Sequence, residues 1–87
     1  MISLAGSDRA QAGTTYCVTA SNVSGALSAR AYVGGQPVPV TVNYDASRHE
    51  ATICFLIPKG AKGGVEVQAA DAGASEYATF STLISRR

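Results

Sequence analysis

The stretch 51–60 restricts the possible folds more than any other part of the 87-residue chain. It reads Ala-Thr-Ile-Cys-Phe-Leu-Ile-Pro-Lys-Gly and contains the most apolar run of the sequence, which ends at Pro58. A proline there would break a helix that tried to continue, because its ring removes an N–H and clashes with the preceding turn. A short apolar run bounded by Pro and Gly therefore predicts a buried β-strand.

The composition favours several short strands over helices. The hydrophobic fraction of 46% is sufficient for a core, and there is no Trp. Ala, Val and Ile supply much of that fraction, while nine Gly and many Thr and Ser indicate strands joined by turns. At 87 residues the chain is near the lower size limit at which an apolar core is sufficient without disulfides or a metal. We therefore expect one domain over residues 1–87.

Charge and hydropathy exclude two classes of partner. The net charge is +1, with no basic cluster beyond Arg86-Arg87, so we expect no nucleic-acid binding. No apolar stretch approaches the ~20 residues that span a bilayer, so we expect no membrane segment. Residues 1–6 do not resemble a signal peptide. We therefore expect a protein that acts where it is made, or a domain cut from a longer secreted chain.

Alternating apolar and polar residues predict strands along the rest of the chain. Together with the central run they make seven segments, at 2–4, 14–20, 28–33, 38–44, 51–57, 65–69 and 76–84. Pro37 and Pro39 place the start of the fourth segment at a sheet edge, because neither has an N–H for the ladder. Turn residues recur about every ten positions, which is typical of an all-β, two-sheet sandwich.

Four segments, in order, are similar to motifs of the IPT/TIG family of immunoglobulin-like domains. They are Ala-Gly-Thr-Thr-Tyr-Cys-Val-Thr-Ala-Ser-Asn-Val-Ser-Gly (12–25), Val-Gly-Gly-Gln-Pro (33–37), Ile-Pro (57–58) with Gly-Gly-Val-Glu-Val (63–67), and Asp-Ala-Gly-Ala-Ser (71–75) before Ala-Thr-Phe (78–80). The family's usual Ser-Pro start is replaced by Leu-Ala-Gly-Ser (4–7). The resemblance implies an immunoglobulin-like sandwich of about seven antiparallel strands. It also implies a role as a spacer, adhesive unit or carbohydrate- or protein-binding module, without a conserved active site.

The cysteines fall on two strands that this topology makes antiparallel neighbours. If Tyr16 points into the core, period two places Cys17 and Cys54 on the outer face. Aligning the two cysteines also pairs Thr19 with Thr52, and opposed Cα atoms lie ~4.5–5.5 Å apart, within disulfide range. A cross-strand disulfide and two free thiols under a partner or loop are both open. A metal site is disfavoured because no third ligand is near.

Leu56 shares the predicted outer face with the cysteines. Leu56, Cys54 and Cys17 would form an apolar patch, which isolated domains tend to avoid. The patch is either a docking surface for another subunit or neighbouring domain, or a face that an edge loop or the first strand covers.

The other sheet is predicted to expose a polar and aromatic face. This candidate binding face consists of Arg30, Tyr32, Glu66, Gln68, Tyr77 and Thr79. Tyr together with Arg is typical of binding surfaces. An ordinary solvated sheet has the same composition, so both interpretations are open.

We find no residue pattern for catalysis, a metal or a cofactor. His49 lies between Arg48 and Glu50 in a predicted turn, where no Ser or Cys nucleophile is placed to use it. The acidic residues are predicted to lie singly in turns, at Asp45, Glu50, Asp71 and Glu76. Calcium needs clustered oxygen ligands. We therefore expect a protein that is not an enzyme and needs no cofactor.

These observations favour a structural or accessory module. Because the chain starts at Met1 without an export signal, the leading hypothesis is a phage virion decoration protein, on a capsid or tail, assembled in the host cytoplasm. It would dock by the Leu56 patch or by its termini, on copies of itself or on a capsid or tail protein, and display the other sheet. The alternative is a spacer or adhesive repeat of a secreted or cell-surface bacterial protein. Tyr32 and Tyr77 would then contact a cell-surface glycan.

Overall fold

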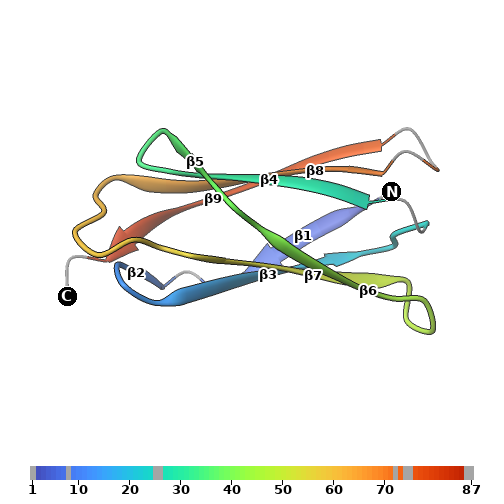
Figure 1. Cartoon of the computed structure of the whole chain (residues 1–87). Coiled ribbons are helices and arrows are strands. Elements are labelled where there is room, and N and C mark those ends of the chain that lie inside the picture. Colours follow the sequence, from blue (N-terminus) through green and yellow to red (C-terminus); the bar gives the residue numbers. More distant parts are fainter. Residues whose placement is uncertain (1, 8, 25–26, 72, 74–75, 86–87) are drawn as a thin grey trace.

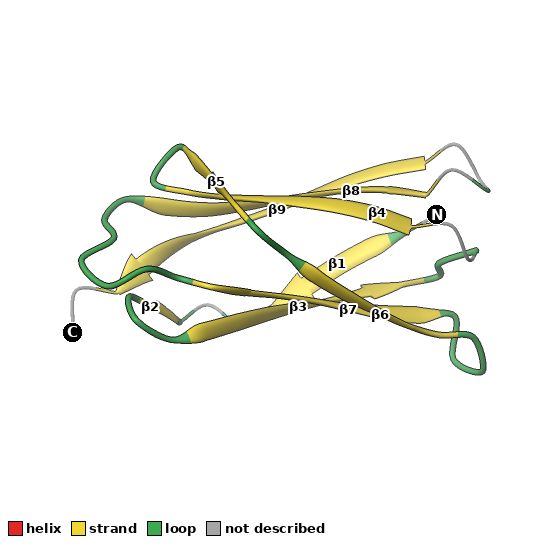
Figure 2. Cartoon of the chain, in the orientation of Figure 1, coloured by secondary structure: helices red, strands yellow, loops and turns green. Residues whose placement is uncertain are grey.

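The computed structural model describes residues 2–7, 9–24, 27–71, 73 and 76–85, and Figure 1 shows their arrangement as two packed layers. Figure 2 shows strands and loops in these parts of the chain. The strands are β1 (Ser3–Gly6), β2 (Ala10–Gln11), β3 (Thr15–Ser21), β4 (Leu27–Val33), β5 (Gln36–Val38), β6 (Thr41–Asp45), β7 (Glu50–Leu56), β8 (Gly64–Asp71) and β9 (Glu76–Ser85).

The strands form two sheets. The four-stranded sheet has the order β1-β3-β7-β6, and the five-stranded sheet has the order β2-β9-β8-β4-β5. Neighbouring strands are antiparallel except β2 and β9, which are parallel. The predicted all-β, two-sheet sandwich is therefore confirmed. The sandwich is elongated, with extents of 37 × 21 × 19 Å.

The central apolar run forms β7, as predicted. Ile53, Phe55 and Ile57 are buried, and the strand lies between β3 and β6 in the four-stranded sheet. The ladder to β3 extends one bond past the strand, where the Ile57 amide donates to the Thr14 carbonyl at 2.9 Å. Pro58 follows directly and cannot donate, so the strand stops there.

Small and β-branched side chains from both sheets form the core. Fully buried members include Val18, Ile53, Val65 and Val67. Tyr16 is the largest ring inside; its centroid lies 5.8 Å from that of Phe55 and 6.4 Å from that of Phe80. The Tyr16 hydroxyl donates to the Ser7 carbonyl, which satisfies its polar end within the sandwich.

The predicted fourth strand, 38–44, is wrong as a single element. The structure divides it into β5, which pairs with β4, and β6, which pairs with β7. The chain changes sheets between them at 39–40, and Pro39, without an N–H, lies at that crossing. Figure 1 shows β5 and β6 as one ribbon that runs diagonally across one side of the sandwich.

A second difference lies near the start of the chain, where we predicted a connection without secondary structure. Within that connection β2 pairs with β9, and its Ala10 is fully buried opposite Ile84. The first strand also begins at Ser3 and ends at Gly6, rather than covering 2–4. With these changes the described residues form nine strands, not about seven.

Candidate docking and binding faces

The outer face of the four-stranded sheet consists mainly of small, uncharged side chains. We call it the threonine face; it comprises Ser3, Ala5, Thr15, Cys17, Thr19, Ser21, Thr41, Asn43, Asp45, Glu50, Thr52, Cys54 and Leu56. Its charged members, Asp45 and Glu50, are directly paired at one end of the sheet, beside the turn from β6 to β7. The remaining rows of this face are neutral.

A disulfide joins Cys17 and Cys54 on the threonine face. Their Cα atoms are 4.1 Å apart, and the two residues are directly paired across β3 and β7. The predicted register is confirmed, since Thr19 also pairs with Thr52. This bridge lies within one sheet and faces outward, whereas the disulfide of antibody domains connects the two sheets through the core.

Leu56 lies at the end of β7, opposite Thr15, and is 58% exposed. The sequence left open whether an edge loop or the first strand covers it. Strand β1 pairs with residues 18–21, toward the other end of β3, so it does not lie over Leu56. The described residues therefore leave an exposed leucine beside the disulfide.

The six residues of the candidate binding face lie on three neighbouring strands of the five-stranded sheet. We call the outer surface of this sheet the tyrosine face. Tyr32 pairs with Glu66, and Arg30 pairs with Gln68, which in turn pairs with Thr79. The Gln68 amide donates to the Glu66 carboxylate at 2.9 Å.

The two tyrosines of this face are not neighbours. Tyr77 is 82% exposed on β9, opposite Ala70, whereas Tyr32 is half-buried on β4. Strand β8 and one side-chain row lie between them, and two strand spacings combined with two row spacings correspond to roughly 16 Å between Cα atoms. Tyr32 and Tyr77 are therefore two separate aromatic positions rather than one stacking platform.

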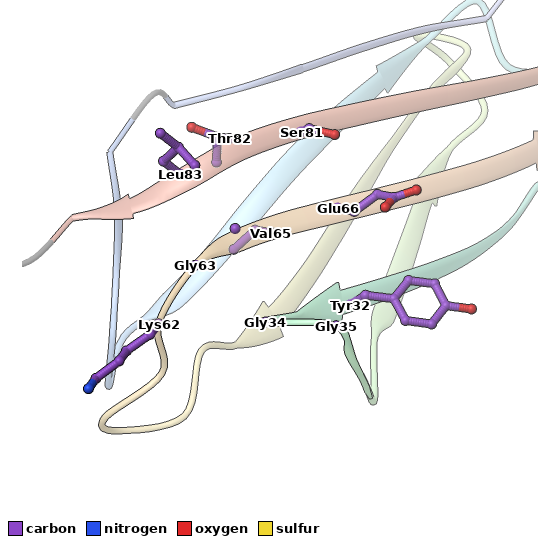
Figure 3. A pocket seen from close by; sticks show the side chains of 11 residues that line it. Tyr32, Gly34, Gly35, Lys62, Gly63, Val65, Glu66, Ser81, Thr82 and Leu83 are labelled. Atoms are coloured by element: carbon purple, nitrogen blue, oxygen red, sulfur yellow. The ribbon is translucent and has the colours of Figure 1, made fainter.

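A hollow of about 600 Å³ opens at the end of the tyrosine face that contains Tyr32. Its lining includes Gly34, Gly63 and Leu83. In Figure 3 the side chains of Tyr32 and Glu66 point the same way, whereas Lys62 points away from them. Ligand sites usually have polar groups that converge on one place. These side chains do not converge, so the geometry of the hollow does not identify a ligand.

Asp71 is a buried residue that the sequence analysis missed. We predicted it in a turn, but it ends β8 and is 1% exposed. Its carboxylate accepts hydrogen bonds from the Ser24 amide at 2.8 Å, the Ser24 hydroxyl at 2.5 Å and the Gly73 amide at 3.2 Å. Ser24 belongs to the connection from β3 to β4, which joins the two sheets. The hydrogen bonds of Asp71 therefore attach this connection to the end of β8.

The polar side chains that bear on catalysis or metal binding are Ser24, Asp71 and His49. The Ser24 hydroxyl donates directly to Asp71, without a histidine between them. His49 is exposed in the turn from β6 to β7, with a φ of 54°. Within the described ranges, no group of three or more His, Cys, Asp or Glu could hold a metal ion. The same parts of the chain contain no helix that is long and apolar enough to cross a membrane.

Asp45, at one end of the threonine face, has a pKa that its hydrogen bonds lower. Hydrogen bonds from the Ser47 hydroxyl at 2.7 Å and the Ser47 amide at 3.1 Å reach its carboxylate. The hydroxyl bond is the largest cause that holds the pKa of Asp45 below the ordinary value of 3.8. The Asp45 carboxyl therefore stays ionised at neutral pH.

Solved structures identify the fold class of this arrangement. Neither a family model nor a curated protein matches the sequence. The trigonal form of titin domain M4 is similar with a TM-score of 0.58 and 10% identity, over 95% of this chain and 92% of that one. The M1 domain from titin is similar with a TM-score of 0.59 and 8% identity, over 88% and 80%. At such identities the similarity shows the fold alone, which is an immunoglobulin-like sandwich.

Proposed function

We propose that this chain is a non-enzymatic immunoglobulin-like structural module that docks on a protein assembly by its threonine face. The observation that supports this assignment is the combination on that face of neutral rows with Leu56, which is 58% exposed. In this proposal the tyrosine face, with its charged and aromatic residues, remains displayed to solvent.

The physical advantage of such a face is a low cost of docking. Small neutral side chains lose little rotamer freedom on contact, and they leave no buried charge without a partner. The disulfide between Cys17 and Cys54 fixes the two central strands before docking, so less ordering is needed when the contact forms. Leu56 then provides one apolar anchor at the end of β7.

The setting that we propose is the surface of a phage virion, where the chain would be a decoration protein of the capsid or tail. Disulfides persist on virion and cell surfaces, which agrees with the oxidised cysteines. The order of the four sequence motifs supports a finer assignment within the immunoglobulin-like fold, to the IPT/TIG family. That assignment also agrees with a non-catalytic module.

A second candidate is a spacer or adhesive repeat of a secreted or cell-surface bacterial protein. Figure 1 favours it in one respect, because β1 begins at one end of the long axis and β9 ends at the other. Modules connected through opposite ends extend a chain in one direction. In this case Tyr77, 82% exposed on the tyrosine face, is the first candidate for contact with a glycan.

The test uses two matched variants, Leu56→Glu and Tyr77→Glu, which place the same charge on opposite faces. Each variant is mixed with virions, and separately with cell envelopes, from the organism that encodes the chain, and cosedimentation is measured. We expect Leu56→Glu to abolish cosedimentation, whereas Tyr77→Glu retains it. Both positions are exposed, so both variants should keep the wild-type melting temperature.

Three results would contradict the proposal. Failure of the wild-type chain to cosediment with either particle would remove the docking function. Loss of binding in Tyr77→Glu alone would assign docking to the tyrosine face. Binding to a cell-surface polysaccharide that Tyr77→Ala eliminates and Leu56→Glu leaves intact would favour the adhesive repeat.

A further inference from the structure

We propose that β6 is a pairing edge, and that its partner is β6 of a second copy of this chain. Among the described strands, β6 is an outer strand of the four-stranded sheet, where it pairs with β7 alone. An outer strand presents unpaired N–H and C=O groups along its free side, and natural sheets usually protect them. The sequence Thr-Val-Asn-Tyr-Asp of β6 contains no Pro, Lys or Arg that would do so.

The register shows which backbone groups of β6 face outward. Cys17 and Cys54 have Cα atoms only 4.1 Å apart, which is typical of an antiparallel pair that does not exchange hydrogen bonds. The groups of Cys54 therefore point to β6, where its partner is Thr41. Ile57 lies three residues after Cys54, so alternation makes it a hydrogen-bonded position, and its amide does donate to the Thr14 carbonyl.

Alternation along β6 then separates its residues into two sets. Thr41 and Asn43 direct their N–H and C=O groups toward β7. Val42 and Tyr44 direct theirs away from the sheet. The free side of β6 therefore presents two donors and two acceptors, spaced two residues apart.

The other outer strands are protected or short. The Gly34 amide donates to the Gly64 carbonyl, so by alternation the backbone groups of Tyr32 on β4 also point to β8. Tyr32 therefore does not exchange hydrogen bonds with Pro37 of β5, and the backbone of Pro37 faces outward. Proline has no N–H, and this removes the outward donor. Strand β2 has two residues. Strand β1 has four residues and lies against β9 of the other sheet, where the Ile2 amide donates to the Glu76 carboxylate at 2.8 Å. The chain thus protects β5 but leaves β6 able to pair.

A second copy fits this edge because β6 is complementary to itself. A two-fold axis at Asn43, the middle of the strand, places Val42 opposite Tyr44 of the second copy. Both residues direct their backbone groups outward, so each pair exchanges two hydrogen bonds. The paired side chains lie on one face, and a β-branched residue opposite an aromatic one stabilises a sheet. Tyr44 is 40% exposed, so it has surface to bury in such a contact.

The dimer would extend the proposed docking function, and this step rests on that function. Antiparallel edge pairing continues the sheet, so the two threonine faces lie on the same side. One dimer would present two Leu56 anchors toward the same assembly. Two linked contacts bind more tightly than one, because the second forms at a high effective concentration.

The experiment combines sedimentation velocity with amide hydrogen exchange on the isotope-labelled chain. We expect a reversible dimer as the concentration rises. At low concentration the amides of Val42 and Tyr44 exchange quickly while those of Thr41 and Asn43 are protected. At high concentration all four are protected. This readout needs no substitution.

A pair of variants tests whether the backbone makes the contact. Val42→Pro removes the outward N–H of each chain in the dimer, as Pro37 does on β5. Val42→Thr keeps this N–H and the β-branched shape. We expect Val42→Pro to raise the dimer dissociation constant about tenfold or more, because two hydrogen bonds are lost per dimer. Val42→Thr should stay within a few fold of the wild type.

The outcomes distinguish this proposal from the proposed function. A wild-type chain that remains monomeric at all concentrations overturns the dimer, whatever Leu56→Glu does to docking. Unprotected Val42 and Tyr44 amides in a dimer overturn the edge contact, as does equal weakening by Val42→Pro and Val42→Thr. Loss of docking in Leu56→Glu with an intact dimer leaves both proposals standing.

Discussion

The two outer faces of the sandwich arise from the same alternation but present different chemistry. The threonine face has neutral rows, a disulfide and one exposed leucine, with acidic residues only at its end. The tyrosine face places Arg30 beside Gln68 and Tyr32 beside Glu66, and it contains a hollow lined by glycines and by Leu83, which is 76% exposed. Both faces point away from the core, so core packing does not explain the difference. The proposed docking by the threonine face would account for the difference, with contact on that side and solvent on the other.

The largest effect is expected at the disulfide that fixes the threonine face. The double variant Cys17→Ser/Cys54→Ser should lower the free energy of unfolding by about 4 kcal/mol, because the bridge closes a long loop in the unfolded chain. The measurement is urea unfolding with and without reductant.

The control for this prediction is the response to reductant. Reductant should destabilise the wild type by a similar amount and leave the double variant unchanged. A double variant as stable as the wild type would show that the bridge does not stabilise this face.

The next effect is expected at the glycine turn beside the tyrosine face. Gly34 and Gly35 have φ values of 57° and 84°, which L-residues rarely adopt. A Cβ on Gly34 would lie 2.8 Å from the Lys62 carbonyl, whereas one on Gly35 would meet nothing within 4 Å. Gly34→Ala should therefore cost about 3 kcal/mol and Gly35→Ala about 1 kcal/mol, measured by chemical unfolding. Equal costs would mean that the contact with the Lys62 loop is not close.

A third effect is expected at Asp71, whose carboxylate holds the connection from β3 to β4 by hydrogen bonds. Asp71→Asn should cost about 2 kcal/mol, because its NH₂ group must face one of the donors that now bond to the carboxylate. Glu66→Gln on the tyrosine face is the matched control, and we expect a change below about 0.5 kcal/mol. Thermal unfolding of both variants checks this. Similar melting temperatures for the two variants would show that the hydrogen bonds of Asp71 do not stabilise this connection.

The smallest effect concerns the acidic end of the threonine face. Ser47→Ala should raise the pKa of Asp45 toward 3.8, because the hydroxyl bond that lowers it is removed. In the wild type the pKa is lower in the folded chain than in the unfolded one. The resulting stabilisation is present above about pH 4 and is lost as the pH falls through the lower folded pKa.

An NMR titration of the Asp45 carboxyl in both proteins measures this shift. An unchanged titration of Asp45 in Ser47→Ala would contradict the assigned cause.

The features that could be predicted from the sequence depend on the local alternation of apolar and polar residues. The strand β7, the inward set Tyr16, Ile53 and Phe55, and the pairing of Thr19 with Thr52 all follow from alternation and one aligned pair of strands. The outward position of Leu56 follows from the same alternation. These features need no knowledge of distant contacts beyond the topology.

The features that the sequence did not predict depend on tertiary contacts. Residues 38–44 keep a single alternation, so their division between two sheets leaves no signal except Pro39. Strand β2 is two residues long and too short to alternate. Asp71 and Ser24 are 47 positions apart, and nothing local to either residue indicates their bond, although Gly73 two positions later is typical of an Asx turn.

The most direct test of the contrast between the faces is hydroxyl-radical footprinting of the chain, free and docked on its particle. Leu56 and Tyr77 are 58% and 82% exposed in the free chain, so both should be labelled there. We predict that docking protects Leu56 and leaves the labelling of Tyr77 unchanged. Protection of Tyr77 with continued labelling of Leu56 would contradict the account, because it would place the assembly on the tyrosine face.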